Sequence, residues 1–261
     1  MPSKNNPFLL ELDWPELPPH FGACSTMRSG GFSQAPYDDG SGQGGGGFNL
    51  GDHVGDSIQA VSDNRAKLAQ FLPTQPHWLT QVHGVDVVQL NSTTSGKLIA
   101  DASFTIQPKV VCAVLTADCL PVLFCDPKNG VVAAAHAGWR GLVDGVLERT
   151  VQTMQQAGAQ VDELLVWLGP AIGPLNFEVG AEVRERFVTF DPISAQAFQP
   201  SEARTEKFYA NIYTLARQRL SKLGVQHISG GSHCTVQQAT QFFSYRRDGV
   251  TGRMASLIWI K

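Results

Sequence analysis

The sequence carries little charge. Only 16% of its 261 residues are Asp, Glu, Lys or Arg, whereas 43% are hydrophobic. This balance excludes a disordered chain, because apolar content on this scale drives the burial of a core. The formal net charge is −3, so no basic field is present to attract nucleic acid or anionic lipid. We therefore expect a small-molecule partner, with no nucleic acid and no membrane.

Long apolar runs are also missing. Residues 8–10 form an apolar run too short for a signal peptide, and no run approaches the ~20 residues of a membrane helix. The five cysteines are an odd number without a Cys-x-x-Cys pair, which argues against a disulfide framework and a zinc ribbon. We expect a cytoplasmic protein in which a functional cysteine acts as a thiolate, alone or beside histidines.

Secondary-structure patterns indicate an α+β protein. Residues 38–47 lack apolar side chains and are predicted to form a flexible, glycine-rich surface loop within one domain spanning residues 1–261. Strands and helices do not alternate strictly, which favours a mixed sheet or two packed sheets with flanking helices over a doubly wound parallel sheet. Apolar spacing predicts helices over 58–71, 142–157, 179–187 and 211–223. Apolar and β-branched runs predict strands over 77–82, 85–90, 110–115, 120–125, 131–136, 164–168 and 255–260.

The segment 111–141 places two apolar strands around Asp126-Pro-Lys-Asn-Gly130, a sequence typical of a turn. If the turn closes between Cys125 and Gly130, Cys119 lies opposite His136, at a Cβ distance of roughly 4.5–5.5 Å. A slip of one residue would swap the two faces. In either register, a thiol and an imidazole meet at the same end of the sheet. His83 lies at a predicted hairpin tip, and spacing alone leaves open whether it joins them.

Ordered motifs extend over nearly the whole chain. They are Ser25-Thr26-x-Arg28-x-Gly-Gly-x-Ser33, Asn49-Leu-Gly-x-His-Val-Gly-Asp56, Gln81-Val-His-Gly84, Ala100-Asp-Ala102, Thr116-Ala-Asp-Cys-x-Pro121, His136-Ala-Gly-Trp-Arg-Gly141, Leu168-Gly-Pro-x-Ile-Gly-Pro174, Cys234-Thr235 and Phe243-Ser-Tyr-Arg-Arg-Asp-Gly249. These motifs resemble those of the YfiH/YlmD-like proteins, the laccase-domain or polyphenol oxidase family. The resemblance implies a four-layer α/β/β/α sandwich with mixed sheets, a fold shared with cysteine hydrolases.

The resemblance further implies that His83, Cys119 and His136 bind a zinc ion, with copper as the other possible metal. Three such ligands leave a fourth position open, which is typical of catalytic rather than structural zinc. The ligating Cys119 would be a thiolate. Asp118 is expected beside the metal as a proton carrier or as an orienting group, so Cys119, His136 and Asp118 form the predicted catalytic set.

Other polar residues in the motifs are expected to contact the substrate. Arg28 and Arg140 are the predicted phosphate or substrate holders, because a planar guanidinium binds two oxygens at once. Gln81, Asn49 and Asp101 are predicted polar contacts. Two features depart from the family pattern and bear on substrate access: the long loop at 38–47, and residues 175–178, where many members carry two cysteines and a tyrosine.

The resemblance implies a zinc-dependent purine nucleoside phosphorylase acting on adenosine, inosine and methylthioadenosine, with adenosine deamination as a side activity. The H-x-E…P-C-x-x-C signature of the zinc base deaminases is absent, so deamination here would have evolved independently on a different fold.

Three alternatives stay open at this point. A copper polyphenol oxidase is one, because two His and one Cys also form the blue-copper ligand set. A multicopper cluster needs more imidazoles than the seven histidines supply, and none of them form a His-x-His pair. A Cys–His hydrolase that edits peptidoglycan precursors is another. A binding module without activity is the third, and it would leave an open metal site without a role.

Overall fold

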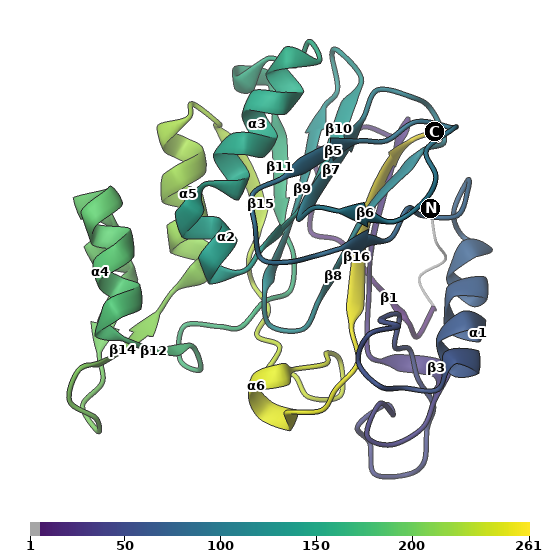
Figure 1. Cartoon of the computed structure of the whole chain (residues 1–261), viewed down its shortest axis with the longest axis horizontal. Helices are drawn as coiled ribbons and strands as arrows, with labels where there is room; N and C mark the ends of the chain where they lie inside the picture. The colour runs from purple at the N-terminus through teal and green to yellow at the C-terminus, as the bar shows by residue number, and fades with distance from the viewer. Residues whose placement is uncertain (1–5) are drawn as a thin grey trace.

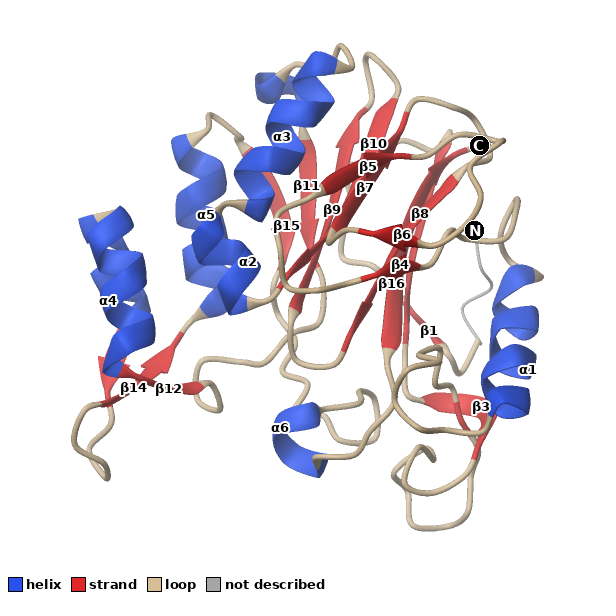
Figure 2. Cartoon of the chain, viewed as in Figure 1, coloured by secondary structure: helices blue, strands red, loops and turns tan. Residues whose placement is uncertain are grey.

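The computed structural model describes residues 6–261, so residues 1–5 of the predicted domain lie outside the described part. Helices occupy two opposite sides of the molecule and the large sheets lie between them (Figure 2). The arrangement is the expected α/β/β/α sandwich with mixed strand directions. Within the described residues, no helix has the length and apolar content needed to cross a membrane.

The larger sheet has six strands in the order β15-β11-β9-β10-β7-β5. It is mixed, because β15 and β5 pair in parallel with their neighbours while the central pairs are antiparallel. Its strands are β5 (Val87–Gln89), β7 (Ala102–Thr105), β9 (Leu120–Asp126), β10 (Val131–Ala137), β11 (Leu165–Leu168) and β15 (His227–Gly230).

The second large sheet is antiparallel and joins segments that are far apart in sequence. Its order is β1-β2-β16-β8, with β1 (Leu9–Leu10), β2 (Phe21–Thr26), β8 (Val111–Thr116) and β16 (Met254–Ile260). Figure 1 shows the yellow β16 running beside strands from the purple and teal parts of the chain. Two small sheets contain β12 (Glu178–Gly180), β13 (Phe198–Pro200) and β14 (Lys207–Ala210), and β4 (Leu79–Thr80) with β6 (Leu98–Ile99).

The helices cover the outer faces of the two large sheets. Helix α1 (Ile58–Ala69) packs on the β1-β2-β16-β8 sheet, beside β3 (Ser29–Ser33). The opposite layer contains α2 (Trp139–Asp144), α3 (Val146–Gln156), α4 (Ala181–Phe190) and α5 (Ile212–Lys222). The short α6 (Tyr245–Asp248) lies at one end of the molecule, next to the start of β16.

Alternating side chains on the central strands produce three large cores, one at each interface between layers, and a fourth small cluster contains Phe242, Phe243 and Met254. In β10, Val131 and Ala133 pack towards the helices, whereas Val132 and Ala134 pack between the two sheets. Both faces of the strand are thus buried, which explains why its sequence is continuously apolar. Burial of one such valine or leucine contributes roughly 1.5–3 kcal/mol.

The β9–β10 hairpin differs from the predicted register by two residues, because His136 pairs with Pro121 and not with Cys119. The cause is the Asp126 side chain. Its Oδ1 accepts hydrogen bonds from the backbone N–H groups of Lys128 and Asn129, both at 2.9 Å. These bonds fold residues 127–130 into the turn and extend β9 to Asp126. A shift of two residues keeps each side chain on its face of the sheet.

Two predicted helices also differ. Gly145 adopts φ 102, a left-handed conformation that ends one helix and begins the next, so residues 142–157 form α2 and α3 with a break. The predicted helix over 179–187 starts two residues later, at Ala181, because residues 178–180 pair with β14. The runs around His83 do not form a hairpin, since β4 pairs with β6 and β5 with β7, both in parallel.

Candidate metal centre

The three predicted ligands meet at one end of the large sheets. His83 lies between β4 and β5, Cys119 precedes β9, and His136 lies near the end of β10. Their potential ligand atoms all lie within 4.8 Å of one another. Cys119 Sγ is 3.7 Å from His83 Nε2, and the two imidazole centroids are 4.8 Å apart. Two nitrogens and one sulfur thus converge in a set that fits a transition metal such as zinc.

Asp101 organises two of the three ligands. Its Oδ1 lies 2.8 Å from His136 Nδ1 and accepts the backbone N–H of His83 at 2.9 Å. Its Oδ2 accepts the backbone N–H groups of Val82 and Gly84 at 3.1 and 2.7 Å. These bonds hold His83 in a left-handed conformation with φ 60. Because Nδ1 of His136 is engaged, its Nε2 is the nitrogen that faces the cluster.

Close packing around the cluster depends on Gly138, directly before α2. A Cβ atom at this position would lie 2.8 Å from His83 Cδ2 and 3.0 Å from Cys119 Sγ. The φ of Gly138 is −62°, so the backbone itself would accept other residues. The glycine is required because the side chains of His83 and Cys119 occupy the space where a Cβ atom would lie.

The protonation of Cys119 and His136 is strongly coupled. Burial disfavours the Cys119 thiolate, but the charges and hydrogen bonds of His136 and His83 outweigh it and lower the pKa of Cys119 from 9.0 to about 6. Burial likewise disfavours the His136 imidazolium, but Cys119 and Asp101 outweigh it and raise the pKa of His136 from 6.5 to about 9. Without a metal, the pair is therefore a thiolate beside an imidazolium at neutral pH.

The cluster opens into a cavity of about 1010 Å³. Of the predicted site residues, Gln81, Asp118 and Arg140 line this cavity together with the three ligands. Arg140 stacks its guanidinium 4.6 Å above the Trp139 ring. The cavity is also lined by side chains outside the predicted set, among them Tyr245, Arg246, Arg253, Lys97 and Trp78.

Asp118 connects the Cys119 loop to the C-terminal part of the chain. Its Oδ1 accepts a hydrogen bond from Thr235 Oγ1, and its Oδ2 accepts the backbone N–H of Arg246, both at 2.6 Å. The residue has φ 86, a conformation that these bonds hold in place. Both carboxylate oxygens are thus engaged in positioning the loop, and the predicted proton-carrying role stays a prediction.

The side-chain amides of Gln81 and Asn49 hydrogen-bond to backbone groups and are therefore not free to bind a substrate in the cavity. The Gln81 amide bridges the backbone N and O of Leu115, both at 2.8 Å. Asn49 is fully buried outside the cavity lining, and its Oδ1 accepts the backbone N–H groups of Gly51 and Arg253. Asp101, also fully buried, orients the ligands as described and does not line the cavity.

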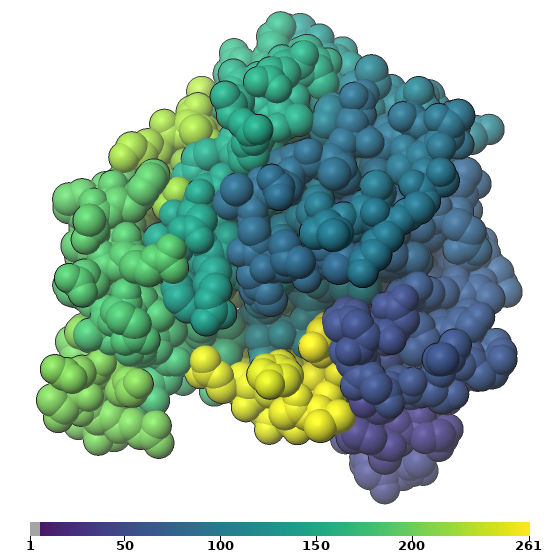
Figure 3. All heavy atoms as spheres, viewed as in Figure 1, coloured from purple at the N-terminus to yellow at the C-terminus, as the bar shows by residue number. Residues whose placement is uncertain are grey.

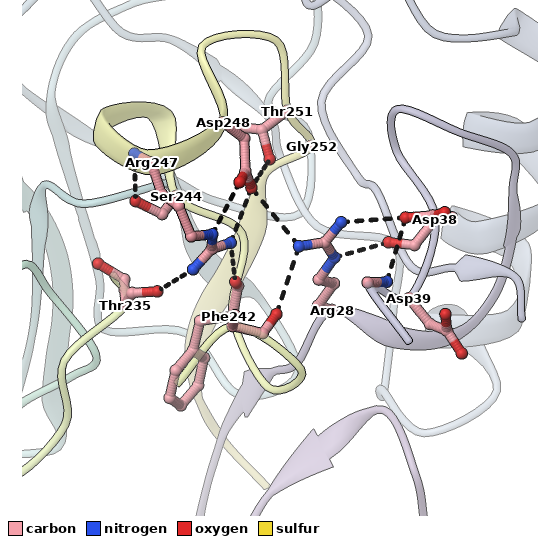
Figure 4. A network of polar contacts seen from close by, with 12 residues as sticks. Arg28, Asp38, Asp39, Thr235, Phe242, Ser244, Arg247, Asp248, Thr251 and Gly252 are labelled. Atoms are coloured by element: carbon pink, nitrogen blue, oxygen red, sulfur yellow. Dashed lines mark hydrogen bonds and ion pairs between the residues drawn. The ribbon is translucent and has the colours of Figure 1, made fainter. Parts of the chain in front are cut away.

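Arg28 is placed away from the cavity, inside a network of charges (Figure 4). Its guanidinium donates to Asp38 O at 2.7 Å and pairs with Asp38 Oδ1 at 3.0 Å and Asp248 Oδ2 at 3.5 Å. Asp248 also pairs with Arg247 at 2.7 Å. Arg28 thus ties the glycine-rich segment 38–47 to α6, and its donors are occupied. The flexibility predicted for that loop stays a prediction.

The fold and the cluster together define a class: a four-layer α/β/β/α protein with a possible metal centre at one end of its sheets. The chain belongs to the family described as multi-copper polyphenol oxidoreductase laccase, whose model matches residues 22–261. This family confirms the resemblance drawn from the sequence motifs.

Individual relatives carry a different activity in their names. A purine nucleoside phosphorylase of Pseudomonas aeruginosa is 52% identical over 95% of this chain and 97% of its own length. The purine nucleoside phosphorylase YfiH of Escherichia coli K12 is 50% identical over 97% and 98%. A crystal structure of a Neisseria meningitidis DUF152 protein superposes with a TM-score of 0.88 at 46% identity, covering 97% of this chain and 99% of that one.

Proposed function

We propose that this chain is a zinc-dependent purine nucleoside phosphorylase with adenosine, inosine and methylthioadenosine as substrates and adenosine deamination as a side activity. The observation that carries the proposal is the convergence of His83, Cys119 and His136 on the cavity of about 1010 Å³. This volume accommodates a nucleoside together with a small anion. Relatives about half identical over nearly their whole length, and named for this activity, support it.

Zinc is favoured by the donor set, which consists of two imidazoles and one thiolate, with no fourth ligand from the described residues in the cluster. When bound there, zinc would supply a Lewis acid that activates an oxygen nucleophile at neutral pH. A multicopper centre needs additional imidazoles, and among residues 6–261 no further histidine joins this cluster.

The two reactions place different demands on the chain. In phosphorolysis, a phosphate oxygen bonds to the ribose C1′ while the bond from C1′ to the base breaks. The electron pair stays with the base, which takes up a proton, and the products are the free base and ribose 1-phosphate. In deamination, a water oxygen bonds to purine C6 and ammonia leaves. Phosphorolysis therefore needs bound phosphate, and the cationic side chains on the cavity wall can bind it.

A Cys–His hydrolase is the second candidate, favoured by the thiolate of Cys119 beside the imidazolium of His136. Such a pair is the usual starting state of a cysteine nucleophile. Metal occupancy separates the two functions, because a thiolate bound to zinc is a poor free nucleophile.

The test combines metal content with product analysis. Protein purified without added metal is expected to contain about one zinc per chain and to convert adenosine to adenine and ribose 1-phosphate only when phosphate is present. Cys119→Ala is expected to lose metal and turnover together, because one of three ligands is removed. Cys234→Ser, outside the cluster, should keep both.

Other results point elsewhere. Turnover by a metal-free Cys119→Ala variant would overturn the zinc mechanism. Zinc without nucleoside turnover would overturn the substrate assignment. Copper as the main metal would favour the oxidase, and a metal-free protein with a reactive Cys119 thiol would favour the hydrolase.

A further inference from the structure

The cavity is cationic although the whole chain has a net charge of −3. Its charged lining includes two carboxylates, Asp52 and Asp118, and both are already engaged, Asp52 with Arg65 at 3.3 Å and Asp118 as described. Within residues 6–261, none of the lysine and arginine side chains of the lining forms an ion pair with a carboxylate. These side chains are Lys97, Arg140, Arg246 and Arg253. The excess positive charge favours an anionic ligand.

Among these cations, Arg253 is held most firmly. The Asn49 side chain accepts its backbone N–H at 2.8 Å, and the backbone N–H of Leu50 donates to its carbonyl at 3.1 Å. A Cβ at Gly51 would lie 2.8 Å from Arg253 Cγ, so this glycine lets the aliphatic stem pack directly on the turn. The 49–51 part of the motif singled out in the sequence is therefore a cradle for Arg253.

The Arg253 guanidinium is fixed along one edge and free along the other. Its Nη1 donates to the backbone carbonyls of Thr251 and Gly252, both at 3.0 Å. Its Nε and Nη2 atoms make no hydrogen bond within the described part of the chain, and together they form the edge that binds two oxygens in parallel. Burial lowers the pKa of Arg253, because the charge is partly removed from water, and the negative charges of Cys119 and Asp118 offset only part of this effect.

Arg246 repeats this arrangement on the same cavity. Its backbone N–H is held by Asp118, and its Nη1 donates to the carbonyls of Asn176 and Glu178, both at 3.2 Å. The α6 segment that carries it lies at the surface between the green and dark blue parts of the molecule (Figure 3). Arg246 is exposed, whereas Arg253 is half-buried, so Arg253 is the better anchor.

We propose that Arg253 is the main phosphate-binding residue of the cavity, with its Nε and Nη2 edge holding two oxygens of inorganic phosphate and Arg246 as a second cation. This inference rests on the proposed function, in which that phosphate attacks the ribose C1′. The sequence suggested this role for Arg28 and Arg140, of which Arg140 also lines the cavity.

Two substitutions test the subsite by phosphate kinetics. Arg253→Gln removes the charge and is expected to raise the KM for phosphate by about 30-fold or more, with the KM for adenosine changed by less than about threefold, because charge-assisted hydrogen bonds are lost on one substrate only. Arg253→Lys keeps the charge without the two-pronged edge and should give an intermediate rise. Arg149→Gln, on α3, replaces an exposed side chain that hydrogen-bonds to Gln152 and lies outside the cavity lining; it is the matched control and should keep both values.

A second measurement does not depend on turnover. Inorganic phosphate at constant ionic strength is expected to raise the melting temperature of metal-free wild-type protein and of Arg149→Gln, but not that of Arg253→Gln. The melting temperature of each variant without phosphate shows that it is folded.

The outcomes separate the subsite from the proposed function. A wild-type protein that forms no ribose 1-phosphate would overturn the function, and the melting experiment alone would then decide the anion site. Ribose 1-phosphate formation with an unchanged phosphate KM in Arg253→Gln would overturn the subsite alone. If adenosine 5′-monophosphate stabilises the protein through Arg253 while inorganic phosphate does not, the site binds a nucleotide phosphate. The assignment of Arg253 to inorganic phosphate is then wrong.

Discussion

One carboxylate, that of Asp101, holds both the His136 imidazole and the His83 backbone, and its position explains why sequence patterns point to it without showing its role. It lies 35 residues before His136 and 18 after His83, and the three meet only because β7 pairs with β10 and follows β5 in the sheet. The Ala-Asp-Ala motif predicts a functional carboxylate. Whether that carboxylate faces the substrate or the ligands depends on strand pairing, which the motif does not contain.

Asp101→Asn should weaken metal binding. The amide keeps one acceptor oxygen but places an NH₂ group against the backbone N–H groups that the carboxylate now accepts, or against the His136 ring. We expect a loss of roughly 10–100-fold in metal affinity, which is typical when a group behind a ligating histidine is changed. Competition with a chromogenic chelator measures it. Asp86→Asn, exposed in the same region, is the control, and an affinity equal to wild type in both would contradict the orienting role.

At the scale of elements, residues in the turns determine the hairpin register and the helix break, which apolar patterns do not predict. The strands of the hairpin and the long helices were predictable because their periodicities are strong. The register was not, since it depends on the Asp126 carboxylate closing the turn, which shifts the partner of each β9 residue by two positions from the predicted one. The break between α2 and α3 was missed for a similar reason, because a single Gly145 lies inside an uninterrupted apolar pattern.

Asp126 should stabilise the hairpin in a pH-dependent way. Burial favours its neutral form, but hydrogen bonds from Asn129, Gln160 and Lys128 outweigh this and lower the pKa of Asp126 below 3.8. A lowered folded-state pKa gives stability that is present above the unfolded value and lost as the pH falls through the folded value. We expect Asp126→Asn to lower the free energy of unfolding by about 2 kcal/mol at pH 7.

Urea unfolding at a series of pH values measures this difference. The gap between wild type and Asp126→Asn should shrink as the pH drops below about 4, because the wild-type carboxylate then becomes protonated. Asp162→Asn, an exposed carboxylate near the same end of the sheet, should show no such gap. A gap that is constant with pH would contradict the role of the Asp126 charge and would assign the loss to the NH₂ group that faces N–H donors in the variant.

On the scale of the whole molecule, Arg28 connects segments more than two hundred residues apart. Arg28→Met leaves Asp38 without its partner and Asp248 with only Arg247, inside a partly buried network. We expect a loss of about 2–3 kcal/mol in the free energy of unfolding, less than for a fully buried pair because both carboxylates are partly exposed. The rise in melting temperature with phosphate should persist, because Arg28 does not line the cavity.

Chemical denaturation and the phosphate melting experiment check the two expectations separately. Arg149→Met, on the opposite side of the sheets, serves as the control for a lost arginine. If Arg28→Met keeps its stability but loses the phosphate response, the assignment drawn from the motif was right and the one drawn from the placement is wrong.

The residues of the metal cluster were easier to predict from the sequence than the long-range contacts that position the rest of the cavity. Motif resemblance named all three clustered residues, because ligand chemistry constrains residue type at each position. The anchors of Arg253 were not visible, because Asn49 and Arg253 are 204 residues apart and meet only when β2 and β16 pair. Composition and local pattern contain no information on that contact.

The place of β16 between β2 and β8 has a consequence for how the protein is made on the ribosome. Residues 21–116 emerge early, yet β2 and β8 have no shared neighbour until residues 254–260 have been translated. The nascent chain therefore exposes two apolar strand edges through most of its synthesis, a state that chaperones recognise and that aggregates readily. Asn49 also has no Arg253 to hold until residue 253 has been synthesised, so the proposed anion site forms only at the end of translation.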